Sequence, residues 1–212
     1  MNRLGFLPAR TLRQEAPLAA LSAGRDDLLA ELAPEGSLHA VEPSATLLEQ
    51  LPGNVRSAPA RGLFTHQAFG NDLPLADDSI DFAYARFVLQ HVAGAQAVVN
   101  EIHRVVRPGG RFCAVDSDDG LVIFHPEEPQ VAELMGKAQQ IQQAQGGDRF
   151  IGRKMQEMMY AAGFTRVTTR VVSLSTSDLP FGALFNILLG YKASLLGDAV
   201  DDSSTSTAED GL

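Results

Sequence analysis

Short apolar runs alternate along the chain with stretches in which apolar residues recur every three or four positions. Runs of the first kind predict strands at residues 18–21, 38–41, 64–68, 80–85 and 111–116. Stretches of the second kind predict helices at residues 26–32, 45–51, 98–106, 130–145, 154–162 and 181–196. Alternating strands and helices are typical of an α/β fold, so we expect a doubly wound, mostly parallel sheet with helices on both faces.

Turn and capping residues mark the boundaries of these elements. Ser44 stands where it can cap the helix that follows it. The run Arg107-Pro108-Gly109-Gly110 predicts the end of one helix and a tight turn into the next strand, and Gly163 predicts the end of another helix. Residues 166–174 alternate between apolar and polar side chains, which predicts one more strand.

The end of the chain has a different composition from the rest. The predicted helix 181–196 is strongly apolar, whereas the residues from Asp198 onward are polar and acidic and have no aromatic side chains. Such a segment has little apolar surface to offset the entropy lost on ordering. We therefore expect one domain at residues 1–197 and a disordered tail at residues 198–212.

Composition narrows the classes of function. With 212 residues, of which 45% are apolar, the chain is long enough for one well-covered core. A formal net charge of -9 opposes binding to nucleic acid. The single cysteine, Cys113, excludes an internal disulfide, and no stretch reaches the roughly 20 apolar residues of a membrane span. We expect a soluble, cytoplasmic protein that binds neither nucleic acid nor a membrane.

Two motifs carry a resemblance to a known family. The segment Asp72-Leu73-Pro74-Leu75-Ala76-Asp77-Asp78-Ser79-Ile80-Asp81-Phe82-Ala83-Tyr84-Ala85, continued by Arg86-Phe87-Val88-Leu89-Gln90-His91, resembles the central signature of class I S-adenosylmethionine (SAM)-dependent small-molecule methyltransferases. The turn Arg107-Pro108-Gly109-Gly110 is similar to a second signature of that family. The resemblance implies a Rossmann-like fold, SAM as the cofactor and a small-molecule substrate.

The resemblance also implies a cofactor site at the carboxyl ends of the first strands. In the family, glycines in the first loop approach the cofactor, and an acidic residue after the second strand holds its ribose hydroxyls. The matching positions here are Ser22, Gly24, Glu42, Pro43, Phe69, Gly70 and Arg86. The chain departs from the family pattern at four positions: Ala20 and Phe69 replace acidic residues, and Ser22 and Asp26 replace glycines, so that only the central glycine of the first loop, Gly24, is kept.

Further positions are candidates for the substrate side of the site. By resemblance these are Phe87, Gln90, Asp116, Asp118 and Tyr191. His91 is a candidate general base because the ordinary pKa of histidine lies near neutrality, although the simpler interpretation is a structural histidine bonded to a neighbouring group. The run from Asp116 to Gly120 could hold a divalent metal, but a solvated turn is the simpler interpretation, and we predict no metal site.

These features predict a SAM-dependent methyltransferase that acts on a small molecule. The altered first loop keeps an alternative open, namely a methyltransferase-like domain that has lost methyl transfer and serves as a partner or regulatory module, or that catalyses a different reaction.

Overall fold

The computed structural model describes residues 18–20, 37–49, 62–185, 189 and 192. Five parallel strands lie in the order β3-β2-β1-β4-β5. Their bounds are Leu18–Ala20 for β1, Ser37–Val41 for β2, Gly62–His66 for β3, Ile80–Arg86 for β4 and Val106–Val115 for β5. The order reverses between β1 and β4, as in a doubly wound sheet, so the predicted fold class is confirmed.

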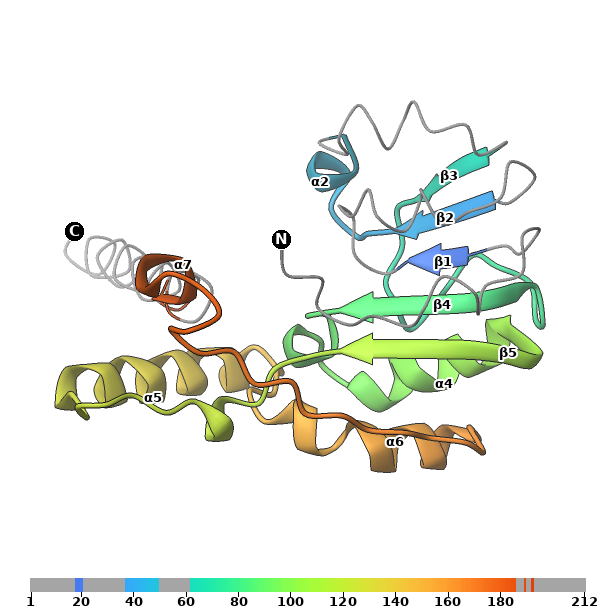
Figure 1. Ribbon diagram of the computed structural model, residues 1–212. Helices are drawn as coiled ribbons and strands as arrows, with labels where there is room; N and C mark the ends of the chain where they lie inside the picture. The colour runs from blue at the N-terminus through green and yellow to red at the C-terminus, as the bar shows by residue number, and fades with distance from the viewer. Residues whose placement is uncertain (1–17, 21–36, 50–61, 186–188, 190–191, 193–212) are drawn as a thin grey trace, which may run out of the picture.

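The helices take up distinct places around the sheet (Figure 1). Helix α4 (Ala95–Val105) covers one face of β4 and β5, and α6 (Met155–Ala162) lies outside α4. Helices α5 (Pro129–Ala144) and α7 (Phe181–Phe185) lie beyond the ends to which the strand arrows point. The remaining described helical elements are α2 (Ala45–Glu49) and three 3-10 turns, η2 (Leu89–His91), η3 (Asp119–Leu121) and η4 (Ile151–Arg153).

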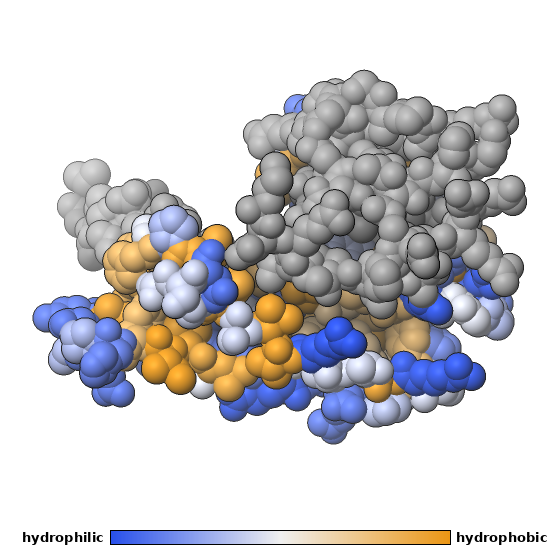
Figure 2. Space-filling model, viewed as in Figure 1, coloured by the Kyte–Doolittle hydropathy of each residue, from blue (hydrophilic) through white to orange (hydrophobic). Residues whose placement is uncertain are grey.

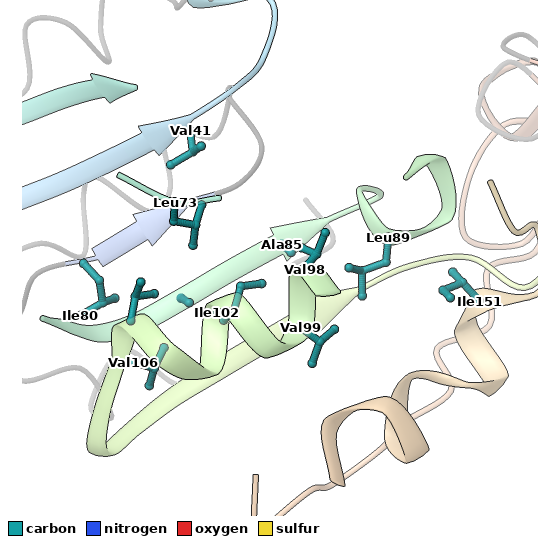
Figure 3. Close-up of a cluster of buried hydrophobic side chains, with 12 residues drawn as sticks. Val41, Leu73, Ile80, Ala85, Leu89, Val98, Val99, Ile102, Val106 and Ile151 are labelled. Atoms are coloured by element: carbon teal, nitrogen blue, oxygen red, sulfur yellow. The ribbon is translucent and has the colours of Figure 1, made fainter. Parts of the chain in front are cut away.

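Helix α4 is held on the sheet by one apolar face. Its residues Val98, Val99, Ile102 and Val105 are almost completely buried, and their spacing of three and four positions places them on one side of the helix. In Figure 3, Val98 and Ile102 point toward β4, the strand that contributes Ile80 and Ala85 to the same cluster. The apolar stripe predicted from the sequence is therefore the main contact between helix and sheet.

The motif at residues 72–79 is fastened to α4 by polar contacts. Glu101 Oε1 accepts a hydrogen bond from the backbone N–H of Leu73 at 2.9 Å. Arg104 donates to the carbonyl oxygens of Leu73 at 3.1 Å and Leu75 at 2.9 Å, and it also pairs with Glu101. These bonds fix the loop that leads into β4, and thereby the direction in which β4 reaches the site.

The run Arg107–Gly110 differs from the predicted turn. The helix ends at Val105 as expected, but β5 already begins at Val106, and residues 107–110 bulge out where the pairing with β4 passes from Ile80–Val106 to Phe82–Arg111. Gly109 has a positive φ of 79°, and a Cβ on Gly110 would lie 2.8 Å from the carbonyl oxygen of Arg107. The two glycines therefore allow a strand bulge in place of a separate turn.

The strand predicted at residues 166–174 is wrong. The structure places this segment outside any helix or strand, and its residues Val171 and Val172 are 77% and 67% exposed. Alternation of apolar and polar side chains supplies no hydrogen-bonding partner for the backbone, and a strand requires one. By contrast, Gly163 ends α6 as predicted, with a φ of 108°.

Several predictions lie outside the described residues. They concern the helix at 26–32, the tail at 198–212 and, in the predicted helix 181–196, residues 186–188, 190–191 and 193–196. Within the part of the chain that is described, no helix is long and apolar enough to cross a membrane.

Candidate functional site

The candidate site lies at the carboxyl edge of the sheet, where the chain leaves each parallel strand. In doubly wound sheets, ligands bind at this edge, next to the point where the strand order reverses. Of the predicted site residues, Glu42, Phe69 and Asp116 lie in the segments that follow β2, β3 and β5, and Arg86 is the last residue of β4. Ser22, Gly24 and Tyr191 lie outside the described residues.

Glu42 follows β2 and is held at both its backbone and its side chain. Its backbone N–H donates to the carbonyl oxygen of His66 at 3.1 Å, which continues the pairing of β2 with β3. Its Oε1 accepts from the backbone N–H of Ser44 at 3.0 Å, and Ser44 Oγ caps α2 by accepting from Leu47 N at 3.3 Å. The half-buried carboxylate is thus oriented at the sheet edge before any ligand arrives.

The segment after β3 presents an aromatic ring. Phe69 is 69% exposed, and its carbonyl oxygen accepts from the backbone N–H of Asp72 in a tight turn that contains Gly70. Gln67 Nε2 donates to the carbonyl oxygen of Pro43 at 3.2 Å, which ties this segment to the one after β2. An exposed ring and an oriented carboxylate on two segments joined at the same edge suit a ligand with both a flat base and hydroxyl groups.

The end of β4 has an unusual backbone conformation. Phe87 has a φ of 52°, in the left-handed region that costs a non-glycine residue about 1–2 kcal/mol. Its N–H donates to the carbonyl oxygen of Val115 at 2.8 Å, and the guanidinium of Arg86 lies 4.9 Å from the centre of its ring. A positive φ of this kind also occurs at Asp78, with 54°, just before β4, so it is not confined to the carboxyl edge.

Asp116 joins the end of β5 to the turn η2. Its carboxylate accepts from the backbone N–H groups of Gln90 at 3.2 Å and Ser117 at 2.9 Å, and from that of Leu89. Burial nevertheless raises the pKa of Asp116 to about 6, against the effect of these hydrogen bonds and of nearby Arg149. Asp116 therefore organises the backbone that carries Gln90 and His91.

A buried polar network, consisting of Gln90, Asp119, Gln142, Arg149 and Lys192, lies behind η2. Arg149 Nη1 donates to the side-chain oxygens of Gln142 at 2.8 Å and Gln90 at 3.1 Å, and Arg149 Nε donates to Asp119 at 2.8 Å. Lys192 Nζ lies 3.4 Å from the other oxygen of Asp119, and burial lowers the pKa of the lysine. This network connects α5, η3 and Lys192 to the carboxyl edge.

His91 ends η2 at the border of this network. Its Nδ1 lies 3.3 Å from Gln142 Nε2. Burial lowers the pKa of His91, and the neighbouring Arg149 lowers it further. At neutral pH the ring is therefore uncharged.

Asp118 is engaged by a neighbouring cation. Arg153 donates to both of its carboxylate oxygens at 2.6 Å, and the backbone N–H of Gly120 donates to Oδ1 at 2.9 Å. These contacts keep the pKa of Asp118 below its usual value. Among the described residues, no group of three His, Cys, Asp or Glu side chains is arranged to hold a metal ion.

Sequence reasoning missed Gln142, Arg149, Asp119 and Lys192. One signal for Gln142 was present, because it continues the helical stripe of Val131, Met135 and Ala138 at the next inward position of α5. Its polar character and the glutamines on both sides, at 139, 140 and 143, made that stretch resemble a solvated face. No comparable signal marked Arg149, which follows α5 in a loop.

A parallel sheet with its order reversed beside β1 and an oriented carboxylate after β2 defines the class of Rossmann-like proteins that bind nucleoside-containing cofactors at the carboxyl edge. Comparison with known proteins narrows this class. Residues 20–114 match the family model described as a methyltransferase domain.

Three similar proteins illustrate the match. A demethylmenaquinone methyltransferase from Symbiobacterium thermophilum is 34% identical over 90 residues, which make up 42% of this chain and 36% of the relative. The crystal structure of a SAM-dependent methyltransferase from Methanosarcina mazei aligns with a TM-score of 0.59 and 14% identity, covering 81% of this chain and 91% of that one. The [4+2]-cyclase SpnF aligns with a TM-score of 0.53 and 16% identity, covering 72% and 52%.

The chain thus spans about a third of the length of the curated relative that it matches. The structural likenesses, at these low identities, show the fold. The match of residues 20–114 to a methyltransferase domain agrees with the resemblance seen in the motifs.

Proposed function

We propose that this protein is a SAM-dependent methyltransferase that acts on a small molecule. The observation that carries the proposal is the carboxylate of Glu42, which is fixed after β2 by the backbone N–H of Ser44 at 3.0 Å. A carboxylate in this place accepts hydrogen bonds from two ribose hydroxyls. The matched methyltransferase family supports the same cofactor.

The residues at the carboxyl edge fit SAM by their chemistry. Glu42 and Pro43 would hold the ribose, exposed Phe69 and Gly70 the adenine, and Arg86 with the first-loop residues Ser22 and Gly24 the remainder. When bound, SAM supplies an electrophilic methyl group on a sulfonium centre. The protein's task is then to align the acceptor atom and to exclude water from the reacting groups.

The substrate side of the site would lie between η2 and α7. We assign Phe87, Gln90, Asp116, Asp118 and Tyr191 to this side, with the hydrogen-bonded Gln90, Asp116 and Asp118 shaping its wall. Figure 2 shows hydrophobic residues around α7, where Phe181 is 63% exposed and Phe185 is 41% exposed. This surface favours an apolar acceptor, so the demethylated quinone named for the Symbiobacterium relative is the first compound to test.

The proposal is tested by calorimetric titration with SAM. Replacing Glu42 by Gln removes the charge but keeps the size, and charge-assisted hydrogen bonds contribute about 1.5–3 kcal/mol, so we expect the affinity to fall about 10- to 100-fold. Glu157→Gln is the matched control, because it makes the same change on the exposed side of α6 and should leave the affinity unchanged. Equal affinity in wild type and Glu42→Gln would remove Glu42 from the site, and no binding of SAM at millimolar concentration would refute the proposal.

A different reaction on the same fold is the second candidate. It is favoured by Ala20 and Phe69, which stand where the family has acidic cofactor contacts, and by the likeness of the fold to that of a cyclase. The two candidates differ in the fate of the methyl group. Transfer of labelled methyl from SAM to an acceptor identifies a methyltransferase, whereas binding of SAM without transfer to any acceptor tested favours the second candidate.

A further inference from the structure

Gln142 occupies a fully buried position on α5 in which its side-chain amide makes three contacts. Arg149 Nη1 lies 2.8 Å from Gln142 Oε1. Gln142 Nε2 lies 2.5 Å from the backbone carbonyl oxygen of Gln90 and 3.3 Å from His91 Nδ1. Only 2% of the surface of Gln142 is exposed, so these contacts are not exchanged for water.

The chemistry of two neighbours fixes which way the amide points. A guanidinium has only donors, so Arg149 must face the amide oxygen of Gln142. A backbone carbonyl has only acceptors, so the oxygen of Gln90 must face the amide nitrogen. One N–H of Gln142 is therefore used by Gln90, and the other points at His91 Nδ1.

The orientation of Gln142 in turn decides the protonation of His91. A nitrogen that receives a donor must offer its lone pair, so Nδ1 of His91 carries no proton, and in the neutral ring the proton sits on Nε2. We propose that Gln142 is a positioning residue that holds His91 as the neutral Nε2–H tautomer, in which Nε2 can act toward any group that it meets only as a hydrogen-bond donor and not as a base.

This inference narrows the substrate class, and in that respect it rests on the proposed function. An imidazole whose Nε2 is protonated donates to an oxygen with an available lone pair, such as a carbonyl or an ionised enol or phenol. It removes no proton from the acceptor unless the tautomer is exchanged, which sacrifices the bond from Gln142. The site would thus suit acceptors that reach it already ionised, or that react through a carbon atom activated by such an oxygen.

The charged groups around His91 are consistent with a neutral ring. Arg149, in the loop before η4, opposes protonation of the ring, and burial acts in the same direction. Asp119 is paired with Arg149 and Lys192, while Asp116 accepts from the backbone of η2. Neither carboxylate is among the groups that shift the pKa of His91.

The test is the nitrogen NMR spectrum of the histidine rings in the full-length protein without SAM. Protonated and unprotonated ring nitrogens resonate far apart, and His91→Asn identifies the signals of His91 by their loss. We expect wild-type His91 to show an unprotonated Nδ1 and a protonated Nε2 at neutral pH. The exposed His125 serves as an internal reference.

Variants of Gln142 complete the test. Gln142→Glu replaces the donor by a carboxylate, which should move the proton to Nδ1 and raise the pKa of His91 by about 1. Gln142→Met removes the donor and should give a mixture of tautomers. Gln143→Glu is the matched control, since it adds the same charge one position along α5 on an exposed side chain and should leave His91 unchanged.

Two results would overturn the inference. One is a wild-type His91 that carries its proton on Nδ1, or that resembles His125. The other is a tautomer that is unchanged in folded Gln142→Glu or, if that variant does not fold, in Gln142→Met. Because no step uses SAM, failure here is distinguishable from failure of the proposed function, which the titration with SAM measures separately.

Discussion

Replacing Arg149 by Met is predicted to destabilise the protein far more than the loss of an exposed cation does. Only 5% of Arg149 is exposed, and its guanidinium is bonded to the side chains of Gln90, Gln142 and Asp119. Met keeps the apolar part of the side chain but leaves three acceptors without this donor. Of the cations that the structure describes beside the carboxylate of Asp119, Lys192, at 3.4 Å, would then remain.

The magnitude follows from the cost of breaking a buried ion pair, which is about 3–5 kcal/mol. Since Lys192 remains beside Asp119, we expect the lower end, about 3 kcal/mol. For a chain of this size, 1 kcal/mol lowers the melting temperature by about 2–4 °C, so the expected decrease is about 6–12 °C. Calorimetry or urea unfolding at pH 7 measures it.

Lys137→Met is the matched control for this prediction. Lys137 pairs with Glu133 one turn away on α5, with both side chains more than half exposed. Such pairs contribute about 0.3–0.5 kcal/mol, so the control should melt within about 2 °C of the wild type. If Arg149→Met were no more destabilising than Lys137→Met, the buried polar network described here would not exist in solution.

Two further predictions concern Asp116 and Gly110. The pKa of Asp116 is raised to about 6 in the folded state from an ordinary value near 3.8, so folding favours the protonated form. Its contribution to stability is fully present below about pH 4 and is lost as the pH rises through 6, by about 3 kcal/mol in total. Urea unfolding at pH 4.5 and 7.5 should therefore show wild type losing stability relative to Asp116→Asn as the pH rises, and a constant difference would contradict the raised pKa. Gly110→Ala would place a Cβ 2.7 Å from Val106 Cγ1 and 2.8 Å from the carbonyl oxygen of Arg107. It should cost about 1–3 kcal/mol in the same assay, and a neutral effect would show that the bulge is more open than described.

The elements that could be predicted are those whose signals are local. The apolar stripe of α4 and the runs that form β2, β4 and β5 follow directly from the side-chain periods of helices and strands. Ser44 and Gly163 could be placed because caps depend on one residue and its immediate neighbours. The family motifs added the direction of the strands and the edge at which a ligand should bind.

The features that could not be predicted depend on contacts between distant segments. Residues 166–174 alternate as a strand does, but whether a partner strand is available is decided by the whole sheet. Arg149 and Lys192 are exposed in most sequence contexts, and their burial here follows from Asp119, which lies 30 residues before the one and 73 before the other. The tautomer of His91 is likewise set by Gln142, a helix-forming residue 51 positions later.

The central claim is that SAM binds at the carboxyl edge of this sheet, and amide chemical-shift mapping tests it most directly. Titrating the isotope-labelled protein with SAM should move the amide signals of Glu42 and Ser44 after β2, of residues 69–71 after β3, and of residues 86–88 at the end of β4. The signals of Asp78 and Gly109, at the opposite edge, should stay in place. No shifts at millimolar SAM, or shifts confined to the opposite edge, would contradict the account.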